Sequence, residues 1–277
     1  MIRRITITIR LKILSFLLSL SFSVNAFGNE EDEYGISQNT LEQLAYHQTW
    51  LKLGHYTKES KSPSGFKSEI KSESFFLAED GKNSPKLELI ATISALRAPV
   101  LDDHNIHAIC KFPARYQWLK TYIKDLLANK IKCDNFVSWK QGPVKSISLV
   151  YATGYLGNPA SFYGHTLIKF NLGNPEKSFL LDSSINFGAR VPPDENPVSY
   201  VVKGVTGGYD ASFSHVDFSF HSNNYGELEK RDLWEYELAL SQAEVDLIVG
   251  HLWEILDKRF TYYFLDKNCA YRMAEVL

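Results

Sequence analysis

The spacing of apolar residues separates the chain into two regions with different patterns. In the first region apolar side chains recur at helical intervals, which predicts helices over residues 40–53, 87–96 and 115–127. The Ser- and Lys-rich stretch 57–74 lacks this pattern and predicts a surface loop. We therefore expect residues 27–143 to form a mostly helical N-terminal region.

Beyond residue 143 the pattern changes to short runs that are typical of strands. Strands are expected over residues 146–153, 165–170 and 178–186. Alternating polar and apolar residues predict another strand over 213–221, while the prolines and glycines between 192 and 208 predict loops. Together with the helices expected further along, these strands indicate an α+β fold for residues 144–277.

Two helices are expected near the end of the chain. Ser241 with Glu244 three residues later is a capping-box signature, and an apolar stripe follows it. Asn268 is a suitable cap for a last helix that begins near Cys269. The chain ends about two turns into this helix, so we expect it to be a truncated form of a longer protein.

The first 26 residues have the pattern of a cleavable signal peptide. They begin with basic residues, continue with an uncharged apolar run from Ile13 to Val24 and end in small residues at Ala26. The run is too short to span a bilayer, which takes about 20 apolar residues. We therefore expect export, with the mature chain in the periplasm.

Removal of residues 1–26 leaves an acidic chain. The segment holds four basic residues and no acidic ones, so 26 Lys and Arg remain against 32 Asp and Glu, a formal charge of −6. Proteins that bind nucleic acid need a basic face. The charge balance therefore argues against a nucleic-acid partner.

The three cysteines predict one disulfide and one free thiol. Cys110 and Cys133 flank a single helical segment, and an oxidising compartment favours a bridge between them. Cys269 lies far from both in the sequence and is then left unpaired. Because a free thiol outside the cytoplasm is a liability, we expect Cys269 to be either buried or used in chemistry.

Cys269 is the best candidate nucleophile of the chain. In the first turn of a helix, unpaired N–H groups and the helix dipole stabilise a thiolate. A thiolate nucleophile also needs a base, usually a histidine, and His165 at the start of a predicted strand is the best partner. Ser184 or Asn186, on the strand that follows, is expected to orient the imidazole.

Other interpretations of these residues remain open. Cys269 and His165 are also compatible with ordinary buried side chains that have no chemical role. A rival set on one face of the alternating strand has residue types that bind zinc: His215, Asp217, Ser219 and His221. A solvated strand face explains the same alternation, so we expect no metal and no cofactor.

His165 followed far downstream by Asn268 and Cys269 resembles the permuted papain-like acyltransferases, which include the lecithin:retinol acyltransferase family. A longer resemblance is to the Lnb-type N-terminal periplasmic domain. It rests on the segments ASFYGHTLIKF, INFGA, VKGVTGGY, RDLWEYELALS and YYFLDKNCAYRM. In the first half it rests on FFLAEDGKNSPKLEL and CKFPARYQWL.

The resemblance implies a circularly permuted papain-like fold, of the kind found in NlpC-type peptidases. It also implies transfer of a fatty acyl chain from phospholipid to the N-terminal amine of lipoproteins, and contact with a membrane surface. The catalytic Cys and His of the family match Cys269 and His165. The Ser in the family's stretch of small residues matches Ser161. Two rival functions are a cysteine peptidase or amidase that acts on cell-wall peptides, and a non-catalytic periplasmic binding or assembly module.

Overall fold

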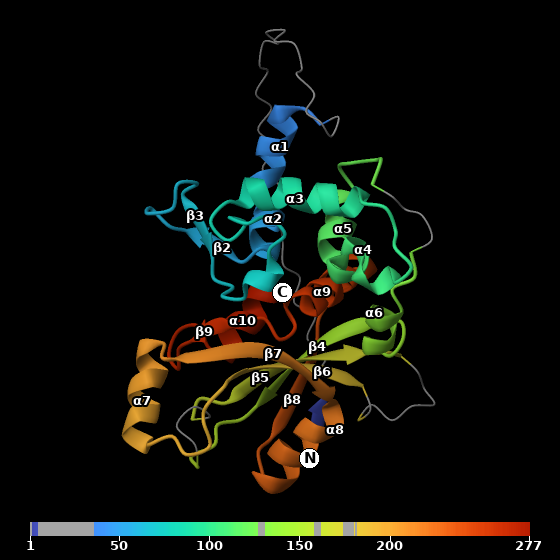
Figure 1. Ribbon diagram of the computed structural model, residues 1–277. Helices are drawn as coiled ribbons and strands as arrows, with labels where there is room; N and C mark the ends of the chain where they lie inside the picture. Colours follow the sequence, from blue (N-terminus) through green and yellow to red (C-terminus); the bar gives the residue numbers. More distant parts are fainter. Residues whose placement is uncertain (1, 5–35, 127–130, 158–161, 174–179, 181) are drawn as a thin grey trace, which may run out of the picture.

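The computed structural model of the protein describes residues 2–4, 36–126, 131–157, 162–173, 180 and 182–277. Figure 1 shows the helices of the first region above a central sheet, with α9 (Gln242–Ile255) and α10 (Cys269–Val276) between them. The predicted α+β class is confirmed. The permuted papain-like arrangement stays a prediction.

The central sheet has the strand order β1-β8-β4-β5-β6-β7-β9. Its neighbouring strands pair antiparallel, except for β1 and β8, which are parallel. β4 and β5 lie where the sequence predicts strands, and β6 extends three residues beyond the expected end. The strands are β1 (Ile2–Arg4), β4 (Ser146–Ala152), β5 (His165–Asn171), β6 (Ser183–Ala189), β7 (Tyr209–Asp217), β8 (Leu233–Glu237) and β9 (Phe260–Tyr262).

The first region contains helices at the three expected places, of which the one over 87–96 is longer than expected and the other two are shorter. The helix expected over 40–53 is two helices: the first ends at Ala45, and His47 caps the second through its Nδ1, which accepts from the Thr49 amide at 3.1 Å. The expected loop 57–74 contains a small hairpin. The elements are α1 (Gln38–Ala45), α2 (Gln48–Leu53), β2 (Tyr56–Lys58), β3 (Phe66–Ser68), η1 (Glu73–Phe75), α3 (Pro85–Arg97), η2 (His104–Ile106), α4 (Ala108–Lys111), α5 (Pro113–Leu119) and α6 (Asp134–Trp139).

The prolines and glycines between 192 and 208 do not form only loops. They enclose α7 (Pro197–Thr206), so the loop prediction was wrong for this segment. The side chain of Asn196 caps the helix by accepting from the Val198 amide, and Gly207 ends it with a φ of +80°. Proline at the first position and glycine just past the end are signals that delimit a helix.

The alternating run expected as one strand to residue 221 is divided in two. β7 ends at Asp217, and α8 (Phe218–His221) with the π-helix η5 (Ser222–Leu228) continues the chain. Phe218 and Tyr225 from these turns pack in a small apolar cluster with Val150 and Leu167. The turns therefore cover part of one face of the sheet.

The two regions predicted from the sequence share one hydrophobic core. Trp50 and Leu89 from the first region belong to the same buried cluster as Ile168 and Phe187 from the sheet. The carboxylate of Glu254 on α9 accepts hydrogen bonds from the first-turn N–H groups of α5, at 2.7 and 3.0 Å. A carboxylate at a helix N-terminus also interacts favourably with the helix dipole. Packing and electrostatics therefore join the regions.

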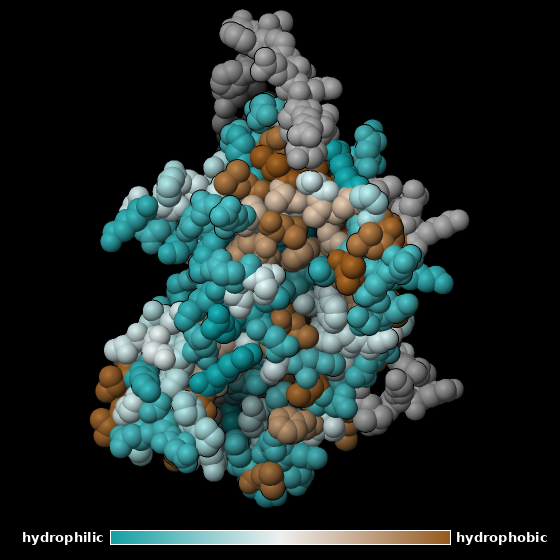
Figure 2. All heavy atoms as spheres, viewed as in Figure 1, coloured by the Kyte–Doolittle hydropathy of each residue, from teal (hydrophilic) through white to brown (hydrophobic). Residues whose placement is uncertain are grey.

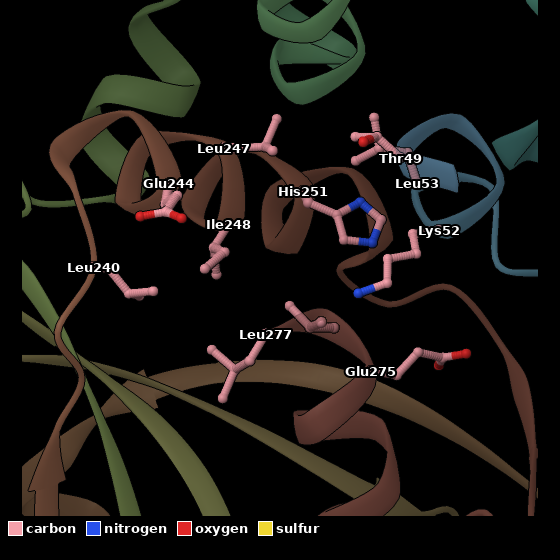
Figure 3. A pocket seen from close by; sticks show the side chains of 11 residues that line it. Thr49, Lys52, Leu53, Leu240, Glu244, Leu247, Ile248, His251, Glu275 and Leu277 are labelled. Carbon is pink, nitrogen blue, oxygen red and sulfur yellow. The ribbon is translucent and has the colours of Figure 1, made fainter. Parts of the chain in front are cut away.

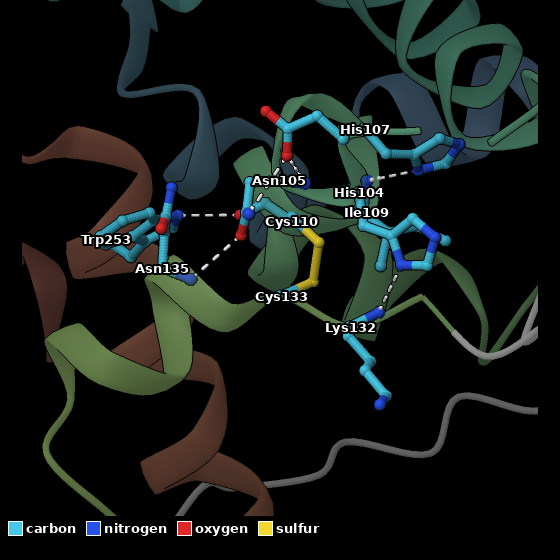
Figure 4. Close-up of a disulfide and its surroundings, with 10 residues drawn as sticks. His104, Asn105, His107, Ile109, Cys110, Lys132, Cys133, Asn135 and Trp253 are labelled. Atoms are coloured by element: carbon cyan, nitrogen blue, oxygen red, sulfur yellow. Dashed lines mark hydrogen bonds between the residues drawn. A yellow bond between two sulfur atoms is a disulfide. The ribbon is translucent and has the colours of Figure 1, made fainter. Parts of the chain in front are cut away.

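Cys110 and Cys133 form a disulfide, as predicted, with their Cα atoms 5.1 Å apart (Figure 4). Hydrogen bonds reinforce the connection on both sides. The Asn135 amide donates to the Asn105 side chain at 3.0 Å, and the Trp253 indole donates to the carbonyl of Cys110 at 2.8 Å. The bridge therefore connects α4 to the start of α6 beside α9.

The predicted signal peptide, residues 1–26, lies outside the described residues apart from β1. β1 is at the edge of the sheet, where it pairs with β8. Among the described residues, no helix combines the length and the apolar character needed to cross a bilayer.

We predict that the disulfide stabilises the fold by about 3 kcal/mol, because it closes a loop of 23 residues in the unfolded chain. The Cys110→Ala/Cys133→Ala variant is expected to unfold at lower denaturant concentration than the wild type. Reductant should lower the melting temperature of the wild type and leave that of the variant unchanged. Equal stability of both proteins under oxidising conditions would contradict the prediction.

Candidate active site

Cys269 is the first residue of α10, where the sequence predicts a helix start. The side chain of Asn268 caps the helix by accepting from the Tyr271 amide at 3.2 Å. α10 packs against β5 and β6, and the Cys269 side chain is only 6% exposed. Among the described residues Cys269 is the free cysteine. The helix start therefore holds the thiol against the sheet.

His165, the first residue of β5, lies beside this thiol. Its imidazole is hydrogen-bonded to the Cys269 side chain, and its Nε2 is 2.5 Å from Oδ1 of Asn186 on β6. Because an amide oxygen only accepts, Nε2 donates its proton to Asn186. Nδ1 is then left to face the sulfur. The structure thus brings Cys269, His165 and Asn186 together.

The electrostatics of the pair shift both groups toward their charged forms. Burial by itself would raise the pKa of Cys269, but the hydrogen bond and charge of His165, with backbone N–H groups of Thr166 and Ala270, lower it. Burial by itself would lower the pKa of His165, but the hydrogen bond and charge of Cys269, helped by Asn186, raise it. The sulfur is therefore charged at a lower pH than an ordinary thiol.

Asn186, not Ser184, orients the imidazole. β5 and β6 pair with Ile168 opposite Ile185, which places Ser184 opposite Lys169 instead of His165. The Ser184 hydroxyl donates to a carbonyl of β7 at 2.8 Å. The sequence left Ser184 and Asn186 as alternatives, because a long loop between two strands leaves their register open. Ser161 lies outside the described residues.

The hydroxyl of Tyr262 is a site group that the sequence did not single out. Tyr262 ends β9 and is 6% exposed, and its hydroxyl is hydrogen-bonded to both the thiol and the backbone of Cys269. Burial, with the Cys269 charge next to it, raises the pKa of Tyr262, so the hydroxyl stays protonated. A donor therefore lies beside the sulfur.

Tyr225 lies beside the imidazole of His165, and Arg231 lies against Tyr225. The Tyr225 ring lies 5.6 Å from that of His165, between centroids, and the Arg231 guanidinium is 4.7 Å from the Tyr225 ring. Arg231 also donates to the carbonyls of Ala152 and Thr153 at the end of β4. Since Ala152 pairs with His165, Arg231 fixes the strand end beside the dyad.

The rival zinc residues do not share one face. His215 is on β7 with its ring 5.3 Å from that of Trp139, whereas His221 is on α8 and stacks on Tyr225. Burial, with a smaller effect of His165, lowers the pKa of His221 to about 4, so its ring is neutral. Within the described ranges, no group of three His, Cys, Asp or Glu side chains is arranged to hold a metal ion.

A cavity of about 200 Å³ lies away from the dyad, between α2, α9 and the end of α10 (Figure 3). Its lining includes His251 together with Glu275 and Leu277 from the C-terminal end of α10. Cys269 is at the opposite end of the same helix. This cavity is therefore separate from the candidate active site.

Comparison with known families gives two matches. Residues 135–277, which contain the dyad, match the Lnb N-terminal periplasmic domain. Residues 42–122 match a domain of unknown function, DUF7843. No curated protein and no solved structure matches the chain.

We predict that His165 controls the reactivity of Cys269. At pH 6 the wild type should react with iodoacetamide at least about ten times faster than His165→Ala, because the variant thiol has lost the partner that lowers its pKa. The difference should shrink at alkaline pH, where both thiols ionise. His215→Ala, which removes a histidine outside the dyad, serves as control. Equal rates for wild type and His165→Ala at pH 6 would refute the pairing.

Proposed function

Because the chain belongs to the Lnb N-terminal periplasmic domain family, we propose that it is a periplasmic thiol-dependent acyltransferase. The family places the chain in the periplasm. Export through a cleavable signal peptide is part of the proposal. The enzyme moves a fatty acyl chain from a phospholipid to the N-terminal amine of a lipoprotein. The observation that carries the proposal is the hydrogen-bonded set of Cys269, His165 and Asn186.

In the first step the Cys269 thiolate attacks the carbonyl carbon of the lipid ester. A sulfur–carbon bond forms, and the ester carbon–oxygen bond breaks. The His165 imidazolium gives its Nδ1 proton to the departing alkoxide, so a lysophospholipid leaves as an alcohol. Asn186 supports this step because its oxygen holds Nε2 and keeps Nδ1 directed at the reacting atoms.

In the second step the lipoprotein amine attacks the thioester. A nitrogen–carbon bond forms, the carbon–sulfur bond breaks, and the amine proton passes to the neutral imidazole of His165. The products are an amide and the original thiolate–imidazolium pair. The acyl chain is thus transferred without any oxidant, reductant or metal.

Tyr262 is suited to stabilise the oxyanion that forms in both steps. Its protonated hydroxyl is hydrogen-bonded to the Cys269 side chain, next to the carbon that becomes bonded to sulfur. Preorganised donors at such a position contribute strongly when negative charge develops on the carbonyl oxygen. We assign Tyr262 this role together with N–H groups at the start of α10.

The surroundings of the sulfur favour transfer over hydrolysis. A thioester that waits for an amine must be kept from water. Cys269 lies in the main apolar cluster with Phe260 and Met273. On the approach, Phe162 and Tyr163 are exposed just before His165 and offer apolar contact to an acyl chain. These contacts support a lipid donor over a polar peptide.

The direct test is to trap the acyl-enzyme. Protein incubated with phospholipid should gain the mass of one fatty acyl chain, and hydroxylamine at neutral pH should remove it, because it cleaves thioesters under conditions in which oxygen esters survive. Cys269→Ser should lack the hydroxylamine-labile adduct, whereas His215→Ala should keep it. An adduct from a cell-wall peptide with none from phospholipid would support a peptidase. No adduct from either would support a non-catalytic module.

We also predict that Tyr262→Phe slows acylation by phospholipid about 100-fold, in the range measured for loss of one oxyanion donor. At alkaline pH, where the thiol ionises with or without the Tyr262 hydrogen bond, its reaction with iodoacetamide should change little, because alkylation forms no oxyanion. Tyr209→Phe, which removes another buried hydroxyl opposite Tyr262 in the sheet, is the matched control. Equal acylation rates for Tyr262→Phe and Tyr209→Phe would rule out the oxyanion role.

A further inference from the structure

α7 carries a row of exposed valines on one side. The row consists of Val198, Val201, Val202 and Val205, which are 72, 46, 54 and 49% exposed. Their spacing places them on one face of the helix. Figure 1 shows α7 at the left edge of the sheet, and Figure 2 shows apolar atoms gathered in the same place. We call these four residues the valine row.

The opposite side of α7 is fixed to the segment that leads into Cys269. The Phe264 amide donates to the Gly204 carbonyl at 2.8 Å, and the Phe264 ring lies 4.9 Å from that of Tyr200. A Cβ atom at Gly204 would be 2.3 Å from the Phe264 ring, so close contact requires glycine here. The valine row is therefore held on a helix that braces the approach to the thiol.

The valine row is electrically neutral. Lys203 is the charged residue of α7, and its ammonium is 2.8 Å from a carboxylate oxygen of Glu195. A neutral aliphatic face enters hydrocarbon without the cost of removing a charge from water. Protein interfaces are instead enriched in aromatic and arginine side chains. The chemistry of the row thus matches hydrocarbon better than it matches a protein partner.

Other exposed apolar side chains precede both members of the dyad in the sequence. Leu265, four residues before Cys269, is 69% exposed. Phe162 and Tyr163, just before His165, are 52 and 73% exposed. Aromatic side chains with a polar tip are favoured where a bilayer meets water. Exposed apolar side chains therefore occur on α7 and also on the segments that lead into both members of the dyad.

We propose that the valine row inserts into the surface of a phospholipid bilayer and brings the dyad to the lipid esters. This inference rests on the proposed function for the identity of the acyl donor. It also goes beyond it, because it names the contact surface and the force that drives binding. Apolar insertion accounts for the contact, so binding should persist at high salt, where charge attraction is screened.

The test compares Val202→Asp with Val137→Asp on α6, a matched control because the two valines are 54 and 52% exposed. Both changes are made in the full Cys269→Ser chain, so that no acyl transfer occurs. Binding to vesicles of phosphatidylethanolamine and phosphatidylglycerol is measured by co-sedimentation. Val202→Asp should bind at least about ten times more weakly than Val137→Asp, at low and at high salt, because a carboxylate resists insertion.

Equal vesicle binding by the two variants would overturn the proposal. Binding of both that disappears at high salt would also overturn it, since charge would then be the driving force. Light scattering tests the alternative that a second copy of the chain, and not a bilayer, contacts the valine row. A dimer that Val202→Asp converts to monomer, without any change in vesicle binding, would assign the row to self-association and reject the membrane.

A second measurement separates this inference from the proposed function. In the chain with Cys269 intact, acylation is compared on vesicles and on a short-chain phospholipid kept monomeric. For each donor, the acylation rate of Val202→Asp is divided by that of Val137→Asp. This ratio should be at least about ten times lower on vesicles than on the monomeric donor. If neither donor acylates any chain while the binding difference persists, the acyltransferase fails and the membrane contact stands. Equal ratios on both donors would reject the contact.

Discussion

The site depends on one constraint: the start of α10 has to meet the start of β5. A buried sulfur ionises only where hydrogen bonds and a positive partner outweigh its burial. Here backbone N–H groups of Thr166 and Ala270 and the His165 imidazole supply both. The neighbouring strands complete the site around this contact. β6 contributes Asn186 behind the imidazole, and β9 places Tyr262 beside the sulfur before the chain turns into α10.

The helical N-terminal region holds α10 through ion pairs with residues that follow Cys269 in this helix. His55 lies 3.0 Å from the carboxylate of Glu275 near the end of α10, and Arg272 pairs with Glu69 at 2.8 Å. Glu254 on α9 caps α5 from across the boundary between the regions. Buried partners of this kind are costly to separate, because each leaves an unpaired charge. The first region therefore positions α10 although it contributes no residue to the dyad.

Local signals in the sequence predicted local structure well. The cap at Asn268, the Ser241 capping box and the disulfide follow from neighbouring residues and are confirmed. Contacts between strands were harder to predict. The choice of Asn186 over Ser184 depends on a register that a long loop leaves open, and the position of the Tyr262 hydroxyl depends on a tertiary contact without a sequence pattern. α7 was missed because its proline and glycine ends look like loop residues.

The central claim is that Cys269 is a thiolate held by an imidazolium. Ultraviolet absorbance of the thiolate, followed across pH, tests it most directly because Cys110 and Cys133 are joined and do not titrate. The account predicts a titration step below the ordinary thiol range, which is lost after alkylation of Cys269 and shifts to higher pH in His165→Ala. A wild-type step at alkaline pH, unchanged in His165→Ala, would contradict the account.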